Sequence, residues 1–294
     1  MTWLYLVIAT IVLWTIVNLF DKYIISHELR DPVLVVTIFG LTSCLLFVGF
    51  ALVVGGDFFS APTVAIVTAL GGVGYSVATW CYYRAMKGEE VSRFVPVLAT
   101  EPLIIAVAAY FLFAEQLAWT NYLGIIIAVI GAILISHHKL QNKAAERILH
   151  LTILGALVFF SARNLIFKYA IGEIDFGAML FWFGLGEAIL PLIFFFFHHP
   201  HLAVKARLGA KHLVGTALIN EAATLLFAKA ITLGPVSLVT GMLATKPLLV
   251  FVLATFMSFF HPKFIRETHS RAVLLRKGAA VVLIVVGGVF IVMR

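Results

Sequence analysis

Charged residues are scarce in this sequence, and their scarcity excludes a water-soluble domain. Of its 294 residues, 12% are charged and 62% are hydrophobic, and the mean hydropathy is +1.07. An average soluble domain is about 25% charged and about half apolar. Cysteine is scarce as well: Cys44 and Cys81 both lie inside apolar runs, which indicates neither a disulfide framework nor a metal site. Most of the chain is therefore expected to be surrounded by lipid or by its own side chains.

Long apolar runs recur along the whole chain, and a run of about 20 residues crosses a bilayer as a helix. The runs predict an all-α polytopic membrane protein with ten transmembrane helices. Their expected ranges are 3–25, 33–54, 62–86, 92–113, 119–136, 151–171, 176–197, 212–232, 236–259 and 272–292. They are too long and too uniformly apolar for the alternating strands of a membrane barrel. The first run lacks the cleavage site of a signal peptide, so we expect it to remain as the first helix.

One hexapeptide occurs twice in the chain. Leu98–Leu103 reads Leu-Ala-Thr-Glu-Pro-Leu, and Leu243–Leu248 reads Leu-Ala-Thr-Lys-Pro-Leu. A second echo, Asn18–Tyr23 and Asn164–Tyr169, keeps nearly the same spacing. Two such echoes far apart in the chain indicate an internal duplication.

The duplication divides the chain into two homologous five-helix halves, 1–136 and 151–294, joined by a polar linker, 137–150. Because each half has an odd number of helices, the second half enters the membrane the other way up. The sequence thus predicts two inverted repeats about an axis in the membrane plane, with a substrate site at their interface.

Several stretches carry a family resemblance: Leu13-Trp14 followed by Lys22, Tyr82-Tyr83-Arg84-Ala85-Met86 through Pro102, Phe113-Ala114-Glu115, and Gly124 with Gly131. With them, the chain resembles the EamA branch of the drug/metabolite transporter superfamily. The resemblance implies a ten-helix transporter, with its fourth-helix proline repeated as Pro247. The second half departs from it, since Ser258–His261 has no acidic counterpart of Glu115.

Loop charge predicts the orientation of the chain. Nearly all loop Lys and Arg residues lie on the side that follows the odd-numbered spans, and the opposite side has Arg294 alone. The positive-inside rule then puts both termini outside, whereas the family resemblance implies cytoplasmic termini, and both readings stay open. Basic loops at an anionic leaflet also account for the net charge of +7, without a nucleic-acid partner.

Ionisable side chains deep inside the apolar spans identify the candidate site, because each costs about 2.5–3.5 kcal/mol at the bilayer centre. The deep set is Glu101, Arg163, Glu187, Glu221 and Lys246. Two interpretations stay open: these charges form ion pairs that fix helix packing, or they line a wet cavity. Because the two hexapeptides are related by the repeat, we expect Glu101 and Lys246 to face each other across this cavity.

Helical spacing adds further candidates. Asn18 and Lys22 are four residues apart and share a helix face, as do Asn164 and Lys168. The predicted substrate-binding residues are Glu101, Lys246, Arg163, Glu221, Asn18, Lys22, Asn164 and Lys168. Candidates for carrying a coupling proton are Glu101, Glu187 and Glu221. Pro102 and Pro247 are predicted to bend their helices and to act as hinges. Snorkelling to the interface is the alternative for Lys22 and Lys168.

The predicted function is secondary transport of a small polar metabolite across a bacterial or archaeal cytoplasmic membrane by alternating access. Export of an amino-acid-like or anionic metabolite is favoured, with protons as possible coupling ions and uniport or exchange left open. The alternative is an integral-membrane enzyme or lipid-handling protein that uses basic and histidine-rich loops such as His198–His201. No nucleophile–base or phosphate-binding motif supports that chemistry, so we expect no enzyme, no cofactor and no bound metal, and the oligomeric state is open.

Overall fold

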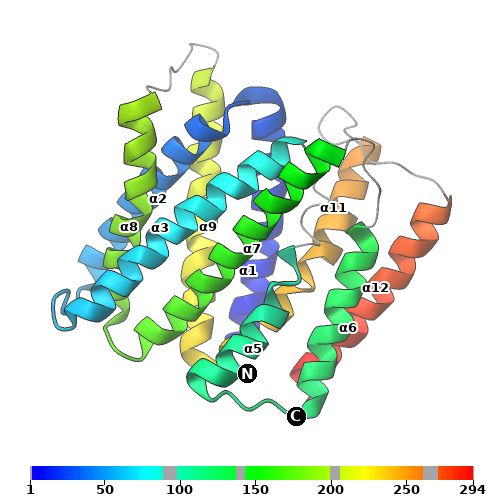
Figure 1. The fold of residues 1–294 in the computed structure, drawn as a ribbon. Coiled ribbons are helices and arrows are strands. Elements are labelled where there is room, and N and C mark those ends of the chain that lie inside the picture. The colour runs from blue at the N-terminus through cyan, green and yellow to red at the C-terminus, as the bar shows by residue number, and fades with distance from the viewer. Residues whose placement is uncertain (1, 89–97, 137–142, 199–205, 261–270, 294) are drawn as a thin grey trace.

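The computed structural model describes residues 2–88, 98–136, 143–198, 206–260 and 271–293, and all regular structure within them is helical. The elements in chain order are α1 (Thr2–Tyr23), the π-helical turn η1 (Ile24–Glu28), α2 (Pro32–Val54), α3 (Pro62–Gly88), α5 (Glu101–Phe113), α6 (Trp119–Ser136), α7 (Lys143–Ile171), α8 (Phe176–His198), α9 (Ala206–Leu233), α10 (Val236–Leu243), α11 (Lys246–Phe260) and α12 (Arg271–Val292). In Figure 1, α2 and α8 lie on one side of the molecule and α6 and α12 on the other.

Among the described residues, seven helical segments are long and apolar enough to cross a membrane. They are Thr2–Glu28, Pro32–Val54, Pro62–Lys87, Leu151–Ile171, Phe176–Phe197, Arg207–Leu233 and Val236–Leu253. Three shorter apolar helices accompany them: Glu101–Phe113, Trp119–Leu134 and Gly278–Val292. The predicted class, an all-α multi-pass membrane protein, is confirmed.

The predicted linker 137–150 overlaps the beginning of the helix α7. The helix α7 begins at Lys143, so the second half of this polar segment continues directly into the sixth predicted span. Its residues Lys-Ala-Ala-Glu-Arg are strong helix formers, which explains why the helix extends beyond the apolar run. Residues 137–142 lie outside the described part of the chain.

The fourth and ninth predicted spans are interrupted where the repeated hexapeptide stands. Ala244 and Thr245 form a turn between α10 and α11, and Ala99 and Thr100 form a turn immediately before α5. The sequence predicted bends in continuous helices, and the structure has breaks there instead. Residues 92–97 of the fourth span lie outside the described ranges.

Proline explains the position of both breaks. Pro102 and Pro247 are the second residues of α5 and α11. A proline has no N–H to give to the carbonyl four residues back, and its ring clashes with that carbonyl, but it fits the first turn of a helix. The two turns also share the same backbone hydrogen bond, from a nitrogen to the carbonyl three residues back. Leu103 N donates to Thr100 O at 3.0 Å, and Leu248 N donates to Thr245 O at 3.1 Å.

Glycines let α8 pack closely between α2 and α3. A Cβ on Gly72 of α3 would overlap the Phe183 carbonyl, and a Cβ on Gly186 of α8 would overlap the Ala69 carbonyl. Gly184 faces Phe47 of α2 in the same way. Gly72, Gly184 and Gly186 therefore let the three helices approach at backbone distance.

The last helices of the two halves, α6 and α12, pack on each other along a small-residue face. A Cβ on Gly124 would lie 2.6 Å from the Ile291 nitrogen, and Ala128 and Ala132 are fully buried. Gly124, Ala128 and Ala132 are spaced by four residues, a small-residue pattern typical of membrane helix pairs.

Three further helix pairs join the two halves of the sequence. The helix α1 packs on α9, α3 packs on α7, and α2 packs on α8. Figure 1 shows α3 and α7 running side by side, with α1 and α9 adjacent at the centre. Residues from both halves therefore meet in the interior of the bundle.

Candidate functional site

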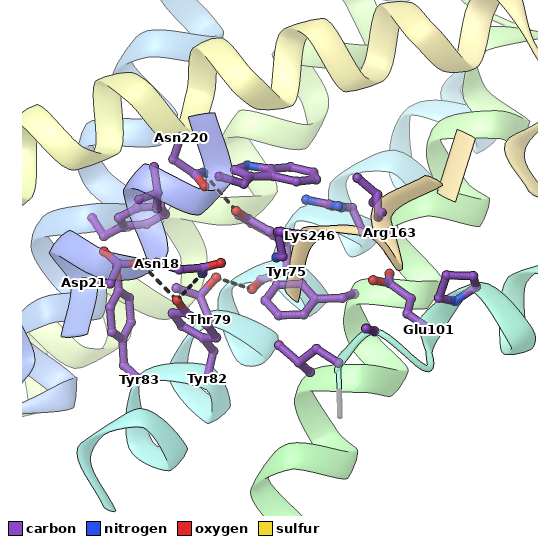
Figure 2. A pocket seen from close by; sticks show the side chains of 18 residues that line it. Asn18, Asp21, Tyr75, Thr79, Tyr82, Tyr83, Glu101, Arg163, Asn220 and Lys246 are labelled. Carbon is purple, nitrogen blue, oxygen red and sulfur yellow. Dashed lines mark hydrogen bonds between the residues drawn. The ribbon is translucent and has the colours of Figure 1, made fainter. Parts of the chain in front are cut away.

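A cavity of about 90 Å³ lies in the interior between the two halves. Its walls come from α1, α2, α3, α7, α9 and the two hexapeptide breaks. The lining residues are Trp14, Val17, Asn18, Asp21, Phe39, Tyr75, Thr79, Tyr82, Tyr83, Leu98, Ala99, Glu101, Pro102, Phe160, Arg163, Asn220, Leu243 and Lys246. Figure 2 shows Glu101 and Arg163 toward one end and Asp21, Tyr82 and Tyr83 toward the other.

Arg163 of α7 is the most deeply buried cation of the cavity, at 4% exposure. Its Nε and Nη2 donate to Oδ1 of the neighbouring Asn164 at 2.9 and 2.8 Å. The Asn164 Nδ2 donates in turn to Glu101 Oε1 at 2.7 Å. One amide thus connects a guanidinium on α7 with a carboxylate at the start of α5.

Aromatic rings surround the Arg163 guanidinium, whose Cζ lies 5.0 Å from the ring centre of Tyr75 and 5.5 Å from that of Trp14. Further rings within 5.9 Å belong to Phe160, Phe167 and Phe227. The ring faces attract the cation, and the attraction strengthens where water is excluded. This cage explains how a buried arginine persists without a carboxylate in direct contact.

Lys246, the first residue of α11, also contacts the aromatic wall, with Nζ 5.7 Å from the Trp14 ring centre. Lys246 and Glu101 both line the cavity, as predicted. In the described part of the chain no ion pair within 4.0 Å joins these two side chains, nor Arg163, Glu187 or Glu221 to a partner. The packing interpretation, in which the deep charges form mutual ion pairs, is therefore wrong for these five residues.

Asp21 of α1 forms the other polar end of the cavity. Its carboxylate accepts hydrogen bonds from the Tyr83 hydroxyl at 2.9 Å and from the Tyr82 hydroxyl at 3.3 Å. Asn18 Nδ2 donates to the Tyr82 oxygen at 2.6 Å, and the Asn18 Oδ1 is buried without a partner. The cavity therefore has carboxylates at both ends and two cations in its wall.

Two further predicted carboxylates lie outside the lining. Glu187 of α8 and Glu221 of α9 are 1% and 3% exposed. Glu221 Oε1 accepts from Ser43 Oγ at 2.6 Å and from Asn220 Nδ2 at 2.9 Å. Asn220 itself lines the cavity, so Glu221 is one residue removed from it.

The two predicted lysines also point away from the lining. Lys22 Nζ donates to the Met86 carbonyl at 2.7 Å. Lys168 Nζ lies 3.8 Å from Glu115 Oε1. Neither lysine is brought to the cavity wall, whereas Asn18, Glu101, Arg163 and Lys246 are.

Glu115 binds the start of α10 instead of facing the cavity. Its carboxylate accepts from the backbone nitrogens of Val236 and Ser237 at 2.7 and 3.1 Å, and from the Ser237 hydroxyl at 2.6 Å. Ala114, with φ of 51°, adopts the left-handed conformation that ends α5 just before it. This carboxylate ties the end of one broken helix to the beginning of the other.

Sequence reasoning missed the aromatic and tyrosine parts of the site. Trp14, Asn18 and Asp21 follow one face of α1, and Tyr75, Thr79, Tyr82 and Tyr83 follow one face of α3. Both stripes have the spacing of residues that lie on one side of a helix, so the signal was present. Among the described residues, no group of three His, Cys, Asp or Glu side chains is arranged to hold a metal ion.

Comparison with known proteins agrees with this architecture. Residues 1–137 match the model of the EamA-like transporter family. A solved crystal structure, described only as that of a protein, covers 98% of this chain and 96% of its own, with a TM-score of 0.71 and 17% identity. At that identity the likeness establishes the fold alone. No curated protein matches the chain.

Proposed function

Because residues 1–137 match the model of the EamA-like transporter family, we propose that this protein is a secondary transporter of a small amino-acid-like or anionic metabolite. It works by alternating access in a bacterial or archaeal cytoplasmic membrane. The observation that carries the proposal is the cavity between the two halves, whose lining includes Arg163, Lys246, Glu101 and Asp21.

The proposed architecture is ten transmembrane helices in two inverted halves, 1–136 and 151–294. The helix contacts support it, since α1 packs on α9 as its counterpart α7 packs on α3. The broken helices support it as well, because each half has its break at the same hexapeptide. Discontinuous helices at a repeat interface are typical of secondary transporter sites.

The charges suggest how the substrate binds. A carboxylate of the substrate would lie against Lys246 and Arg163, while a substrate amine would reach Glu101 or Asp21. Trp14 and Tyr75 give an aromatic wall beside these groups. A zwitterion would pair with both the cations and a carboxylate of the cavity, whereas an anion would pair with Lys246 and Arg163 alone. Asn18 contributes the unpartnered Oδ1 as a further acceptor. Lys22 and Lys168, beyond the lining, are proposed to act along the substrate path.

Motion is proposed to centre on the two breaks. A turn without regular helix hydrogen bonds changes direction at lower cost than a continuous helix, and transporter cavities open by rocking of one repeat against the other. Pro102 and Pro247 maintain these breaks and are therefore the proposed hinge residues.

Counterflow in proteoliposomes tests the proposal. Vesicles loaded with unlabelled L-amino acids should accumulate the corresponding labelled amino acid transiently, and Lys246→Ala and Glu101→Gln should abolish this. The matched controls are Lys229→Ala and Glu173→Gln, which change exposed side chains outside the cavity lining. Equal counterflow in all four variants would exclude the central site. No counterflow of amino acids or small organic anions in the unmodified protein would exclude this substrate class.

Orientation and direction are part of the same proposal. Loop charge puts the basic loops in the cytoplasm and both termini outside, and the proposed direction is export. A cysteine introduced at Thr2 should react with a membrane-impermeant maleimide on intact cells. Labelling only after lysis would show that the N-terminus is cytoplasmic and would contradict the proposed orientation.

A further inference from the structure

Behind the cavity wall, two carboxyl groups from different helices share one buried site. Glu187 and Glu221 are 1% and 3% exposed, and neither lines the cavity. Ser43 of α2 lies between them, donating to Glu221 Oε1 at 2.6 Å and standing beside Glu187. We propose that this Glu187–Glu221 pair binds one exchangeable proton and couples its movement to transport. The proposal rests on the transport function proposed above.

The unpartnered oxygens of the pair point to a proton. Glu187 Oε2 and Glu221 Oε2 are both buried and have no hydrogen-bond partner. Two ionised carboxylates that share a buried site repel each other, and one of the two takes up a proton. A protonated carboxyl is also a donor, so a single proton supplies the donor that the buried oxygens lack.

The surroundings do not neutralise the pair in another way. The titratable groups that interact with it are Cys44 on α2, Tyr75 on α3 and Arg163 on α7. Arg163 is the one permanent cation among these three, and its Nε and Nη2 are bound to Asn164. In the described part of the chain, neither glutamate has an ion-pair partner within 4.0 Å.

Packing at the pair favours a proton over a metal cation. Gly72 and Gly186 bring the backbones of α3 and α8 together beside Glu187, and a Cβ on Gly72 would lie 2.7 Å from the Glu187 nitrogen. The Ser76 hydroxyl also donates to the Glu187 carbonyl, at 2.5 Å. A sodium ion needs space for several oxygen ligands, whereas a proton binds a carboxylate oxygen without a cavity.

Hydrogen bonds connect the pair with the substrate site. Asn220 Nδ2 donates to Glu221 Oε1 at 2.9 Å and to the Tyr75 hydroxyl at 3.1 Å. The Tyr75 ring lies 5.0 Å from the Arg163 guanidinium. An anion that draws Arg163 toward itself should therefore displace the Tyr75 ring, whose hydroxyl is bonded to Asn220. When Glu221 gains or loses a proton, its hydrogen bond with Asn220 changes in strength. The bond from Asn220 to Tyr75, and with it the position of the ring beside Arg163, should change as well.

The chemical change at the glutamate pair is the binding and release of one proton. In one conformation a proton from water forms an O–H bond at a carboxylate oxygen of the pair. In the other conformation that bond breaks and the proton returns to water on the opposite side, so no electrons are exchanged. Glu101 remains at the cavity, bound to Asn164, and serves the substrate.

Infrared spectroscopy of the purified protein tests the proton directly and needs no substrate. At pH 7 the unmodified protein should show a carbonyl stretch of a carboxylic acid that shifts in D2O. The band should be lost in Glu187→Gln/Glu221→Gln and retained in the exposed-site control Glu173→Gln. Absence of the band in the unmodified protein, or its persistence in the double variant, would overturn the proposal.

Transport then separates this inference from the proposed function. With labelled L-amino acids as probes, a pH gradient should drive accumulation in the unmodified protein. Glu187→Gln, which changes the member of the pair that was not predicted to bind substrate, should keep counterflow, which needs no gradient, and its accumulation ratio should fall to about one. Accumulation that survives in Glu187→Gln, or that follows a sodium gradient instead, would overturn the inference. Absence of counterflow in the unmodified protein counts against the transport proposal alone, because the infrared result stands without it.

Discussion

Arg163 and Glu101 are bound to the two ends of the same side-chain amide. Arg163 donates twice to Asn164 Oδ1, at 2.9 and 2.8 Å, and Asn164 Nδ2 donates to Glu101 Oε1 at 2.7 Å. The amide keeps the opposite charges within electrostatic reach without direct contact. It also fixes the start of α5 against α7, across the two halves of the chain.

Asn164→Ala should therefore leave a buried guanidinium and a half-buried carboxylate without their shared partner. Hydrogen bonds to charged groups contribute about 1.5–3 kcal/mol each, so we expect a loss of about 3 kcal/mol in unfolding free energy, together with loss of transport. Thermal and denaturant unfolding in detergent measure the first effect. Asn18→Ala, at the position that matches Asn164 in the similar stretch Asn18–Tyr23, removes one bond to a neutral hydroxyl and should cost about 1 kcal/mol. Equal losses in the two variants would contradict this role of Asn164.

Arg163→Lys should lose nearly as much transport activity as Arg163→Gln. A lysine keeps the charge but cannot make two hydrogen bonds to one amide oxygen, nor present a planar group to the surrounding rings. We expect the counterflow rate to fall at least tenfold, which corresponds to about 1.4 kcal/mol. The matched control is Lys246→Arg, which also conserves the charge and changes the other cation of the cavity. Full activity of Arg163→Lys would show that charge alone is needed at this position.

Gly72→Ala should destabilise the protein by about 1–3 kcal/mol, because the added methyl group meets the backbone of α8 and the helices must separate. Gly215→Ala is the matched control, since a Cβ there has nothing within 4 Å. That control should be neutral or stabilising by up to about 1 kcal/mol, the intrinsic gain of alanine over glycine in a helix. Thermal stability of the purified variants distinguishes the two sites. A neutral Gly72→Ala would contradict the close approach of α3 and α8.

Glu115→Ala should loosen the beginning of α10, because it removes three acceptor contacts to Val236 and Ser237. A charge-assisted bond is worth about 1.5–3 kcal/mol, so hydrogen exchange at these two amides should accelerate about tenfold or more. Lys168→Met should change the exchange little, since the ion pair is 3.8 Å long and Lys168 is partly exposed. Unchanged exchange in Glu115→Ala would show that α10 is held by packing alone.

Much of the helical arrangement could be predicted from the sequence, since apolar length determines which segments cross a bilayer. The span 119–136 coincides with α6, and the ends of α2 and α8 differ from prediction by one residue. The breaks could not be predicted from the same signal. The apolar runs continue through Ala99–Thr100 and Ala244–Thr245, and a proline in such a run indicates a bend as readily as an interruption.

The site was predicted where charge alone identifies it. Glu101, Arg163 and Lys246 line one cavity because lipid excludes all three. The prediction missed the carboxylate of Asp21 and the aromatic residues of the lining. The sequence pattern of a membrane helix does not show whether a phenylalanine or tyrosine contacts lipid or a buried cation. Only the tertiary packing of α1, α3, α7 and α9 brings their rings around Arg163.

The hexapeptide difference also acts through the helix dipole. Glu101 and Lys246 are each the first residue of a helix, where the aligned peptide groups carry about half a positive charge. A glutamate there completes the dipole of α5, whereas a lysine adds like charge to that of α11, at a cost of about 0.3–1 kcal/mol. An anion bound at Lys246 would offset that repulsion, so an occupant of the cavity would also stabilise the first turn of α11.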